Sequence, residues 1–292
     1  MIFLKTSTAS IFYFGAMKEV DVEIRRAEGL GDYQAIVELE KEVWGYTERE
    51  DLAAVPILMI ANRFGGAVLV AQESSGRIIG FSMANLGWTR EKKLFWWSHM
   101  TAVIDEYRGR DIGHRLKMRQ REEALAAGID EIHWTFDPLQ ALNAHFNIHK
   151  LGAIVREYEE NVYGNSPSPL HRGLPTDRLV AEWHLDSDRG PALILRDIDG
   201  TPRINTPDSE PDLRLETSPL LLEIPTNINA LRETDIGQAK LWQDRVRTAC
   251  CHYFEAGYVI TDFILVNEPR TQALYVLEKE SKTKGNSGTD KI

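Results

Sequence analysis

An abrupt change of pattern between residues 93 and 127 constrains the fold of this chain more than any other feature. Residues 93–104 (KLFWWSHMTAVI) are typical of a strand, whereas residues 112–127 have helical period and precede Gly128, which suits a helix end. The turn between them, Arg108 to Gly113, opens the helix at once. A helix N-terminus presents free backbone N–H groups and the positive end of its dipole. We therefore expect this turn to hold an anion.

The patterns around that turn predict a layered sheet. Upstream we expect a strand at 20–27, helices at 32–44 and 49–64, and strands at 67–72 and 77–85. Downstream we expect a strand at 131–136, a helix at 138–151, and strands at 154–163 and 178–185. This order favours an α/β (α+β) fold with helices on both faces of the sheet.

The composition changes after residue 185. Residues 186–219 are rich in proline and acidic side chains, whereas the pattern of residues 220–278 predicts a smaller α/β unit. Its expected elements are strands at 220–224, 258–266 and 273–277 and a helix at 234–256. The predicted division of the chain is a loose extension (1–16), a main domain (17–190), a linker with a hairpin at Asp199-Gly200 (191–219), a C-terminal α/β extension (220–278) and a disordered tail (279–292).

Charge and cysteine content narrow the function. The formal net charge is −10, which disfavours a nucleic-acid partner and an anionic membrane surface, because both require a positive field. Cys250 and Cys251 are adjacent and suit a reducing, cytoplasmic compartment rather than a disulfide framework. No apolar run has the length of a membrane span.

The turn resembles the acyl-CoA signature of the GNAT (GCN5-related N-acetyltransferase) superfamily, Gln/Arg-x-x-Gly-x-Gly/Ala. Arg108 and Ile112-Gly113 match it, with Ala102-Val103 at the usual spacing before them. Segments 134–139 and 146–153 are similar to a little-described branch of that family. The resemblance covers residues 20–185 and implies a mixed, mostly antiparallel central sheet.

The resemblance also implies that acetyl-CoA or another acyl-CoA is the co-substrate. In the family, the strand end pairs with the pantetheine arm and the turn holds the diphosphate. These cofactor contacts map onto Thr101, Ala102, Val103, Arg108, Gly109, Arg110, Asp111, Ile112, Gly113 and His114.

Two positions depart from the family pattern. Asp111 stands where the first glycine of the signature is expected, and a carboxylate repels a diphosphate unless it points away or caps the helix. Ile148 stands where many members have the tyrosine that protonates the leaving thiolate. A non-catalytic, degenerate GNAT fold that binds a ligand or a partner is therefore the alternative hypothesis.

Two histidines are candidate catalytic residues. His99 lies on the strand before the turn, where alternation places it on the face of Trp97 and Thr101, and it could act as general base. His145, on the helix after the fifth strand, could replace the missing tyrosine as acid. The competing interpretations are a core histidine at position 99 and a helix-surface histidine at position 145.

Four further residues are candidates for acceptor binding: Trp97, Trp134, Asp137 and Asn143. Core packing is the competing interpretation for the tryptophans, a helix cap for Asp137, and a surface role for Asn143. No metal signature is present, since His145 and His149 lack an intervening glutamate and a third ligand.

The resulting hypothesis is a cytoplasmic N-acyltransferase that transfers acetyl or another short acyl group, such as succinyl, to a small-molecule amine similar to an amino acid. A third interpretation, acetylation of protein N-termini or lysines, requires an open groove instead of an enclosed pocket. The sequence leaves a homodimer open.

Overall fold

The structure is a computed structural model that describes residues 21–46, 52–89, 92–164, 173–186, 198, 200–266 and 271–280. The described residues form two compact units. Unit 1 extends to Trp134 and unit 2 starts at Thr135.

Unit 1 is a sheet with helices on both faces. Its strands are β1 (Val22–Arg26), β2 (Ala67–Glu73), β3 (Ile78–Trp88), β4 (Leu94–Val103) and the start of β5 (Glu131–Phe136). Its helices are α1 (Gly29–Trp44), α2 (Val55–Arg63), the short 3-10 turn η2 (Asp105–Tyr107) and α3 (Ile112–Ala126). Neighbouring strands from β1 to β4 are antiparallel, and β5 runs parallel to β4.

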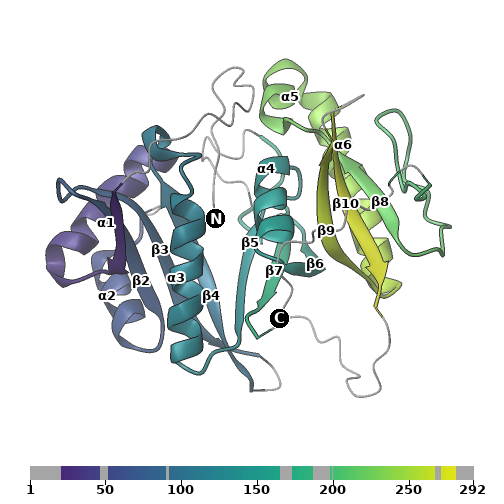
Figure 1. Cartoon of the computed structure of the whole chain (residues 1–292). Coiled ribbons are helices and arrows are strands. Elements are labelled where there is room, and N and C mark those ends of the chain that lie inside the picture. Colours follow the sequence, from purple (N-terminus) through teal and green to yellow (C-terminus); the bar gives the residue numbers. More distant parts are fainter. Residues whose placement is uncertain are drawn as a thin grey trace. The chain divides into compact units, whose positions relative to one another are not determined.

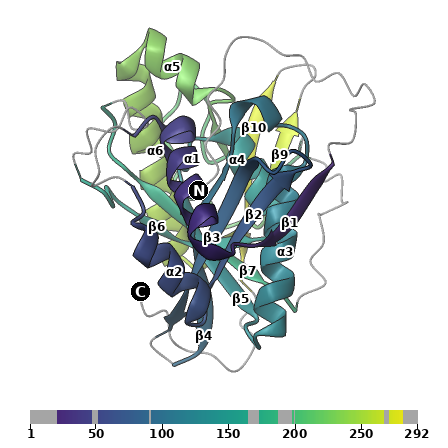
Figure 2. The same cartoon turned by 90° about the vertical axis from the view of Figure 1, so that its left-hand side faces the viewer.

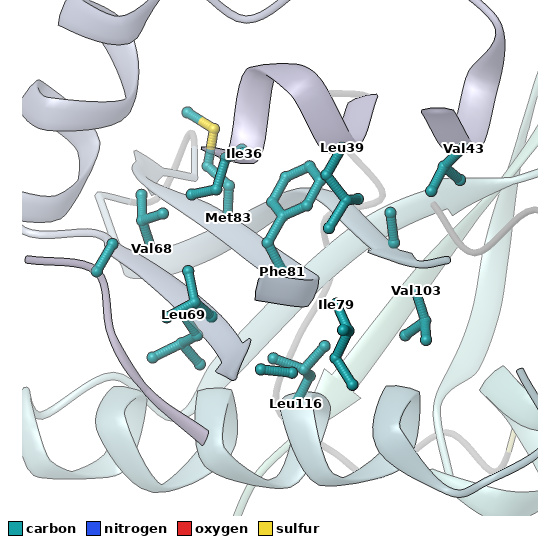
Figure 3. Close-up of a cluster of buried hydrophobic side chains, with 14 of the residues drawn as sticks. Ile36, Leu39, Val43, Val68, Leu69, Ile79, Phe81, Met83, Val103 and Leu116 are labelled. Atoms are coloured by element: carbon teal, nitrogen blue, oxygen red, sulfur yellow. The ribbon is translucent and has the colours of Figure 1, made fainter. Parts of the chain in front are cut away.

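The hydrophobic core of unit 1 lies on both faces of this sheet. Figure 2 shows α1 and α2 on one side of the strands and α3 on the other. In Figure 3, Ile36 and Leu39 of α1 meet Phe81 from above, while Leu116 of α3 approaches Ile79 from below. Each of these side chains is at least 95% buried, and such burial contributes roughly 1.5–3 kcal/mol per side chain. This packing fixes α3, and hence its N-terminus, against the sheet.

Strand β4 contains an irregularity near its middle. Met100 pairs with Met83 of β3, yet the next pair joins Ser98 to Ala84, so β4 carries one extra residue at this point. Such a β-bulge changes the direction of side chains and bends the strand. Strict alternation of faces therefore does not hold across residues 98–101.

Unit 2 contains a second run of antiparallel strands (Figure 1). Its elements after β5 are α4 (Ala141–Ala144), the π-helical turn η3 (His145–Lys150), β6 (Ile154–Glu159), β7 (Arg178–His184), β8 (Leu220–Ile224), α5 (Ile228–Thr234), α6 (Ile236–Glu255), β9 (Tyr258–Val266) and β10 (Gln272–Lys279). The strands follow the order β7-β6-β9-β10-β8. Helix α6 packs against β6, β8 and β9, and η3 packs against β9.

The predicted fold class, a mixed and mostly antiparallel α/β sheet with helices, is confirmed. The two units divide the chain inside the predicted 17–190 domain, because β6 pairs with β9 and η3 packs on that strand. Helix α5 was not predicted; the Asn227 side chain caps it by accepting the Ala230 N–H at 3.1 Å. The 1–16 extension, the hairpin residue Asp199 and most of the predicted tail lie outside the described residues. No helix in the described ranges combines the length and apolar character that a membrane crossing requires.

Candidate functional site

The turn between β4 and α3 leaves backbone amides exposed at a helix start. Gly109 and Asp111 both adopt positive φ, +74° and +62°, which redirects the chain into α3. The first helical hydrogen bond runs from the Arg115 N–H to the Asp111 carbonyl at 3.0 Å. The N–H groups of Ile112, Gly113 and His114 precede that bond, and the N-cap side chain accepts none of them. Unbonded backbone N–H groups at a helix start are the feature that binds anions in many proteins, so the turn suits an anion.

The Asp111 side chain does not cap the start of α3. Its carboxylate is mostly exposed and lies 3.5 Å from Nδ1 of His114. Among non-glycine residues, aspartate tolerates the left-handed conformation comparatively well, so the turn survives the departure from the family pattern. The remaining effect of Asp111 is its negative charge beside the α3 N-terminus.

Removing that charge should strengthen the binding of a diphosphate. We expect Asp111→Asn to tighten acetyl-CoA binding about tenfold, which corresponds to about 1.4 kcal/mol of relieved repulsion. Isothermal titration measures the effect. Asp130→Asn, which removes a carboxylate just beyond the C-terminal end of α3, serves as the control and should leave Kd unchanged. Unaltered or weaker binding by Asp111→Asn would show that the anion does not approach this turn.

Arg108 ties the turn to the end of β4. Its Nε donates to the Val103 carbonyl at 3.3 Å, and its Nη2 lies 2.8 Å from the Asp105 carboxylate. Its Nη1 is buried without a hydrogen-bond partner in the described part of the chain. Burial lowers the pKa of the guanidinium, and the nearby Asp105 charge opposes this shift. One N–H of this arginine is thus available to a bound group.

The edge of β4 that faces β5 is open beyond Trp97. The described residues of the two strands pair only at Trp96 with Ile132 and at Trp97 with His133. Ser98 and residues 100–103 keep their pairing with β3 on the other edge. Backbone N–H and C=O groups of this free edge can pair with an extended ligand, as an added strand would. The free edge leads directly into the turn at Arg108.

A buried polar cluster fixes α3 to the strands below this site. Lys117 Nζ donates to Ser98 Oγ at 3.0 Å and to Gln120 Oε1 at 2.9 Å. Gln120 Nε2 donates in turn to Ser82 Oγ at 2.9 Å. Thr101 Oγ1 donates to the same Ser82 hydroxyl at 3.1 Å. Ser98 and Thr101 of β4 are therefore connected through this cluster to α3, whose N-terminus forms the turn.

Lys117 is the most unusual member of this cluster. It is 3% exposed, and its Nζ lies 3.9 Å from the centre of the Trp134 ring. Burial lowers the pKa of Lys117 from 10.5 to about 7, because the charged form is poorly solvated there. Sequence reasoning missed this residue. Gln120 offered a signal, since it falls four residues from Leu116 and from Ala124 on the buried stripe of the helix.

His99 and Thr101 do not share an environment. Thr101 is buried against Ser82, and Ser98 reaches Lys117, whereas the His99 side chain is exposed. The prediction that alternation places His99 and Thr101 on one face is wrong, because the β4 bulge interrupts the alternation. His99 is exposed and does not belong to the buried cluster.

The predicted acid, His145, lies in unit 2 in the π-helical turn η3. Its ring stacks on that of His149, with centroids 4.7 Å apart. Burial, together with the neighbouring His149 and Lys150, lowers the pKa of His145 to about 4. The imidazolium that an acid would need is thus almost unpopulated at neutral pH, which argues against the predicted role. Ile148 is buried and offers no proton at the position of the family tyrosine.

The predicted acceptor-binding residues have different surroundings. Trp97 is half-buried on β4, and Trp134 is buried beneath Lys117 in unit 1. Asp137 belongs to unit 2, where one carboxylate oxygen accepts the Leu139 N–H at 2.9 Å and the other accepts from Arg232 at 3.0 Å. Asn143, also in unit 2, accepts a hydrogen bond from Asn147 at 3.4 Å.

Asp137 ends β5 and, by accepting the Leu139 N–H, makes a turn before the following helix. As a result, the helix predicted from residue 138 begins only at Ala141. Both of its carboxylate oxygens are engaged within the fold.

Residues 33–152 match the model of the Acetyltransferase (GNAT) family. This stretch therefore forms a GNAT acetyltransferase domain, and the family resemblance drawn from Arg108 and Ile112-Gly113 is confirmed for it. No curated protein matches the chain.

Several solved structures are similar to this chain at low identity. The NatC complex bound to Gag peptide and CoA has 14% identity and a TM-score of 0.46, over 56% of this chain and 98% of that one. The ribosomal-protein-S18-alanine N-acetyltransferase from Escherichia coli has 13% identity and a TM-score of 0.45, over 59% and 99%. The protein yncA from Salmonella typhimurium, solved with acetyl-CoA, has 19% identity and a TM-score of 0.44, over 59% and 99%.

Proposed function

We propose that the chain is an acyl-CoA-dependent N-acyltransferase whose donor lies along the free edge of β4, with its diphosphate on the N-terminus of α3. One observation carries this proposal: in unit 1, uncapped first-turn amides of α3 follow, after the short η2 turn, a strand edge that has lost its neighbour. The first feature suits a diphosphate, and the second suits the amide-rich pantetheine arm. The acetyltransferase family of the domain supports the same donor.

The reaction is a direct transfer between donor and amine. The amine nitrogen attacks the thioester carbonyl carbon, a C–N bond forms, and the C–S bond breaks. A base takes one proton from the amine, and the leaving thiolate receives one. A backbone N–H near Val103 would stabilise the oxyanion. His99, exposed on β4, is the proposed base.

The acceptor we propose is a small-molecule amine similar to an amino acid, and the acyl group is acetyl or another short chain such as succinyl. A release assay for free thiol, with these acyl-CoAs against a panel of amines, amino acids and peptides, tests the proposal. Turnover of small amines supports the proposal. Turnover of peptides alone would mean that the acceptors are proteins and not small molecules. No thiol release together with tight CoA binding would support the non-catalytic alternative, which Asp111 and Ile148 favour.

His99→Gln should lower turnover of the best amine at least about tenfold, because a positioned general base contributes on the order of a hundredfold or more. The loss should be smaller at high pH, where more of the amine is already deprotonated. The matched control is His252→Gln on α6 of unit 2, which should keep full turnover. Equal rates for the His99 variant and the wild type would remove His99 from the mechanism.

A further inference from the structure

Unit 2 contains an arginine whose charge is buried and only partly bonded. Arg178, the first residue of β7, is 2% exposed. Its Nη1 donates to the Asp177 carbonyl at 2.9 Å. Its Nε and Nη2 are buried and have no hydrogen-bond partner among the described residues. A buried N–H of a cation without a partner is costly, so such groups are normally satisfied.

The two free nitrogens are a matched pair. Nε–H and Nη2–H lie on one edge of the planar guanidinium and point in parallel. Two parallel N–H groups at this spacing fit the two oxygens of a carboxylate. The Asp177 carbonyl holds the opposite side of the group, so the free edge is fixed in direction.

The carboxylates nearby do not neutralise Arg178. The Asp177 carboxylate accepts from Tyr158 and from Arg247 at 2.6 and 2.8 Å. The Asp137 carboxylate pairs with the buried Arg232, whose own Nε also lacks a partner among the described residues.

The charges around Asp137 do not balance. Burial tends to raise the pKa of Asp137, but the charges of Arg232 and Arg178 outweigh it, so the pKa is lowered. Two guanidinium groups thus act on one carboxylate, and the Arg178 guanidinium also lies over the Tyr163 ring, with its Cζ 5.2 Å from the ring centre.

We propose that the free edge of Arg178, with Arg232 beside Asp137, binds the carboxylate of a small molecule in unit 2. The binding site stands on the geometry of unit 2 alone. Its assignment to the acceptor, which would make the acceptor a carboxylate-bearing amine such as an amino acid, rests on the proposed function. Arg178 would then be a residue that determines acceptor specificity.

Thermal unfolding of the full chain tests the binding site without any turnover. Sodium acetate, benzoate and N-acetylglycine are compared with sodium chloride at equal ionic strength. For the wild type we expect the carboxylates to raise Tm by about 2 °C or more, because a ligand that binds only the folded state stabilises it. Sodium phosphate at the same ionic strength shows whether the site prefers a planar carboxylate.

Two variants separate ligand binding from a structural role. Arg178→Met removes a cation that lacks a full set of partners, so Tm in chloride should stay equal or rise, and the response to carboxylates should vanish. Arg156→Met, on the neighbouring β6, is the matched control; it removes an arginine that pairs with Glu182 and Glu280 and should keep the response. If Arg178→Met does not fold, Arg178→Lys keeps the charge without the paired N–H edge and should also lose the response.

Catalysis then tests the assignment to the acceptor. Arg178→Lys should raise KM about tenfold or more for an amino acid such as phenylalanine, and leave KM unchanged for phenethylamine and for acetyl-CoA. A wild-type Tm that carboxylates do not raise, with a lower Tm for Arg178→Met, would overturn the site. Absence of all turnover with an intact carboxylate response would instead reject the proposed function and keep the site.

Discussion

Introducing a carboxylate at residue 113 should weaken acetyl-CoA binding about a hundredfold while leaving the fold intact. Gly113 lies in the first turn of α3, directly after Ile112. A glutamate in the first turn of a helix interacts favourably with the dipole, so Gly113→Glu should fold at least as stably as the wild type. The same charge repels a diphosphate at the amides. We expect Kd to rise about a hundredfold, which is about 2.7 kcal/mol.

Ala126→Glu is the matched control, because it adds the same charge at the exposed opposite end of the same helix. It should leave the acetyl-CoA affinity unchanged, as measured by isothermal titration. Circular dichroism and Tm establish that both variants are folded. Wild-type affinity in a folded Gly113→Glu variant would mean that the cofactor binds elsewhere.

Replacing Lys117 by Met should raise the free energy of unfolding of the protein at pH 6. The pKa of Lys117 falls from 10.5 to about 7 on folding, and at about 1.4 kcal/mol per pH unit this corresponds to about 5 kcal/mol of destabilisation when the lysine is charged. Loss of the bonds to Ser98 and Gln120 offsets part of the gain, at about 1 kcal/mol each. We therefore expect a net gain of about 3 kcal/mol, measured by guanidinium denaturation.

The gain in unfolding free energy that Lys117→Met produces should become smaller as the pH rises. Below pH 7 the lysine is charged in both states, so its full cost is present. Between pH 7 and 10.5 the unfolded chain holds a proton that the folded chain has released, so stability rises with pH. Lys117→Met should lack this rise, whereas the exposed Lys41→Met should retain it. A wild-type stability that falls across this interval would contradict the burial of a neutral lysine.

Glu40 makes the unfolding free energy change with pH in the opposite direction, and it does so at lower pH. Burial raises the pKa of its carboxyl from 4.5 to about 7, and a hydrogen bond from the Ala53 N–H opposes part of the shift. The folded chain then holds a proton that the unfolded chain has lost, so stability falls between pH 4.5 and 7. From these two groups together, the unfolding free energy should pass through a minimum near pH 7.

Much of the fold could be predicted from periodicity. The strands at 220–224 and 258–266 have the bounds of β8 and β9, because continuous apolar runs between turn residues leave few alternatives. The helix predicted at 138–151 begins only at Ala141 and continues as a π-helical turn. The Asp137 side chain causes the late start by accepting the Leu139 N–H. A local side-chain bond of this kind leaves no periodic signal.

The candidate site could be predicted only where its residues lie next to each other in the sequence. The turn at Arg108–Gly113 could be found because a strand end and a helix start are adjacent. The bulge in β4 could not, since it depends on the register of Met100 against Met83. The partial bonding of Arg178 could not be found either, because Asp137 and Arg232 come from distant segments. The bulge and the bonding of Arg178 depend on contacts between distant segments and on burial. The spacing of residues in one sequence does not show such contacts.

Hydrogen exchange in the presence of acetyl-CoA tests the central claim most directly. If the diphosphate binds the amides at the start of α3, saturating acetyl-CoA should slow exchange in the peptide of residues 104–116, and most strongly at Gly109 to His114. Peptides from α6 in unit 2, Ile236–Glu255, should exchange at unchanged rates. Bound acetyl-CoA with no added protection at residues 104–116, or no binding at millimolar concentration, would contradict the account.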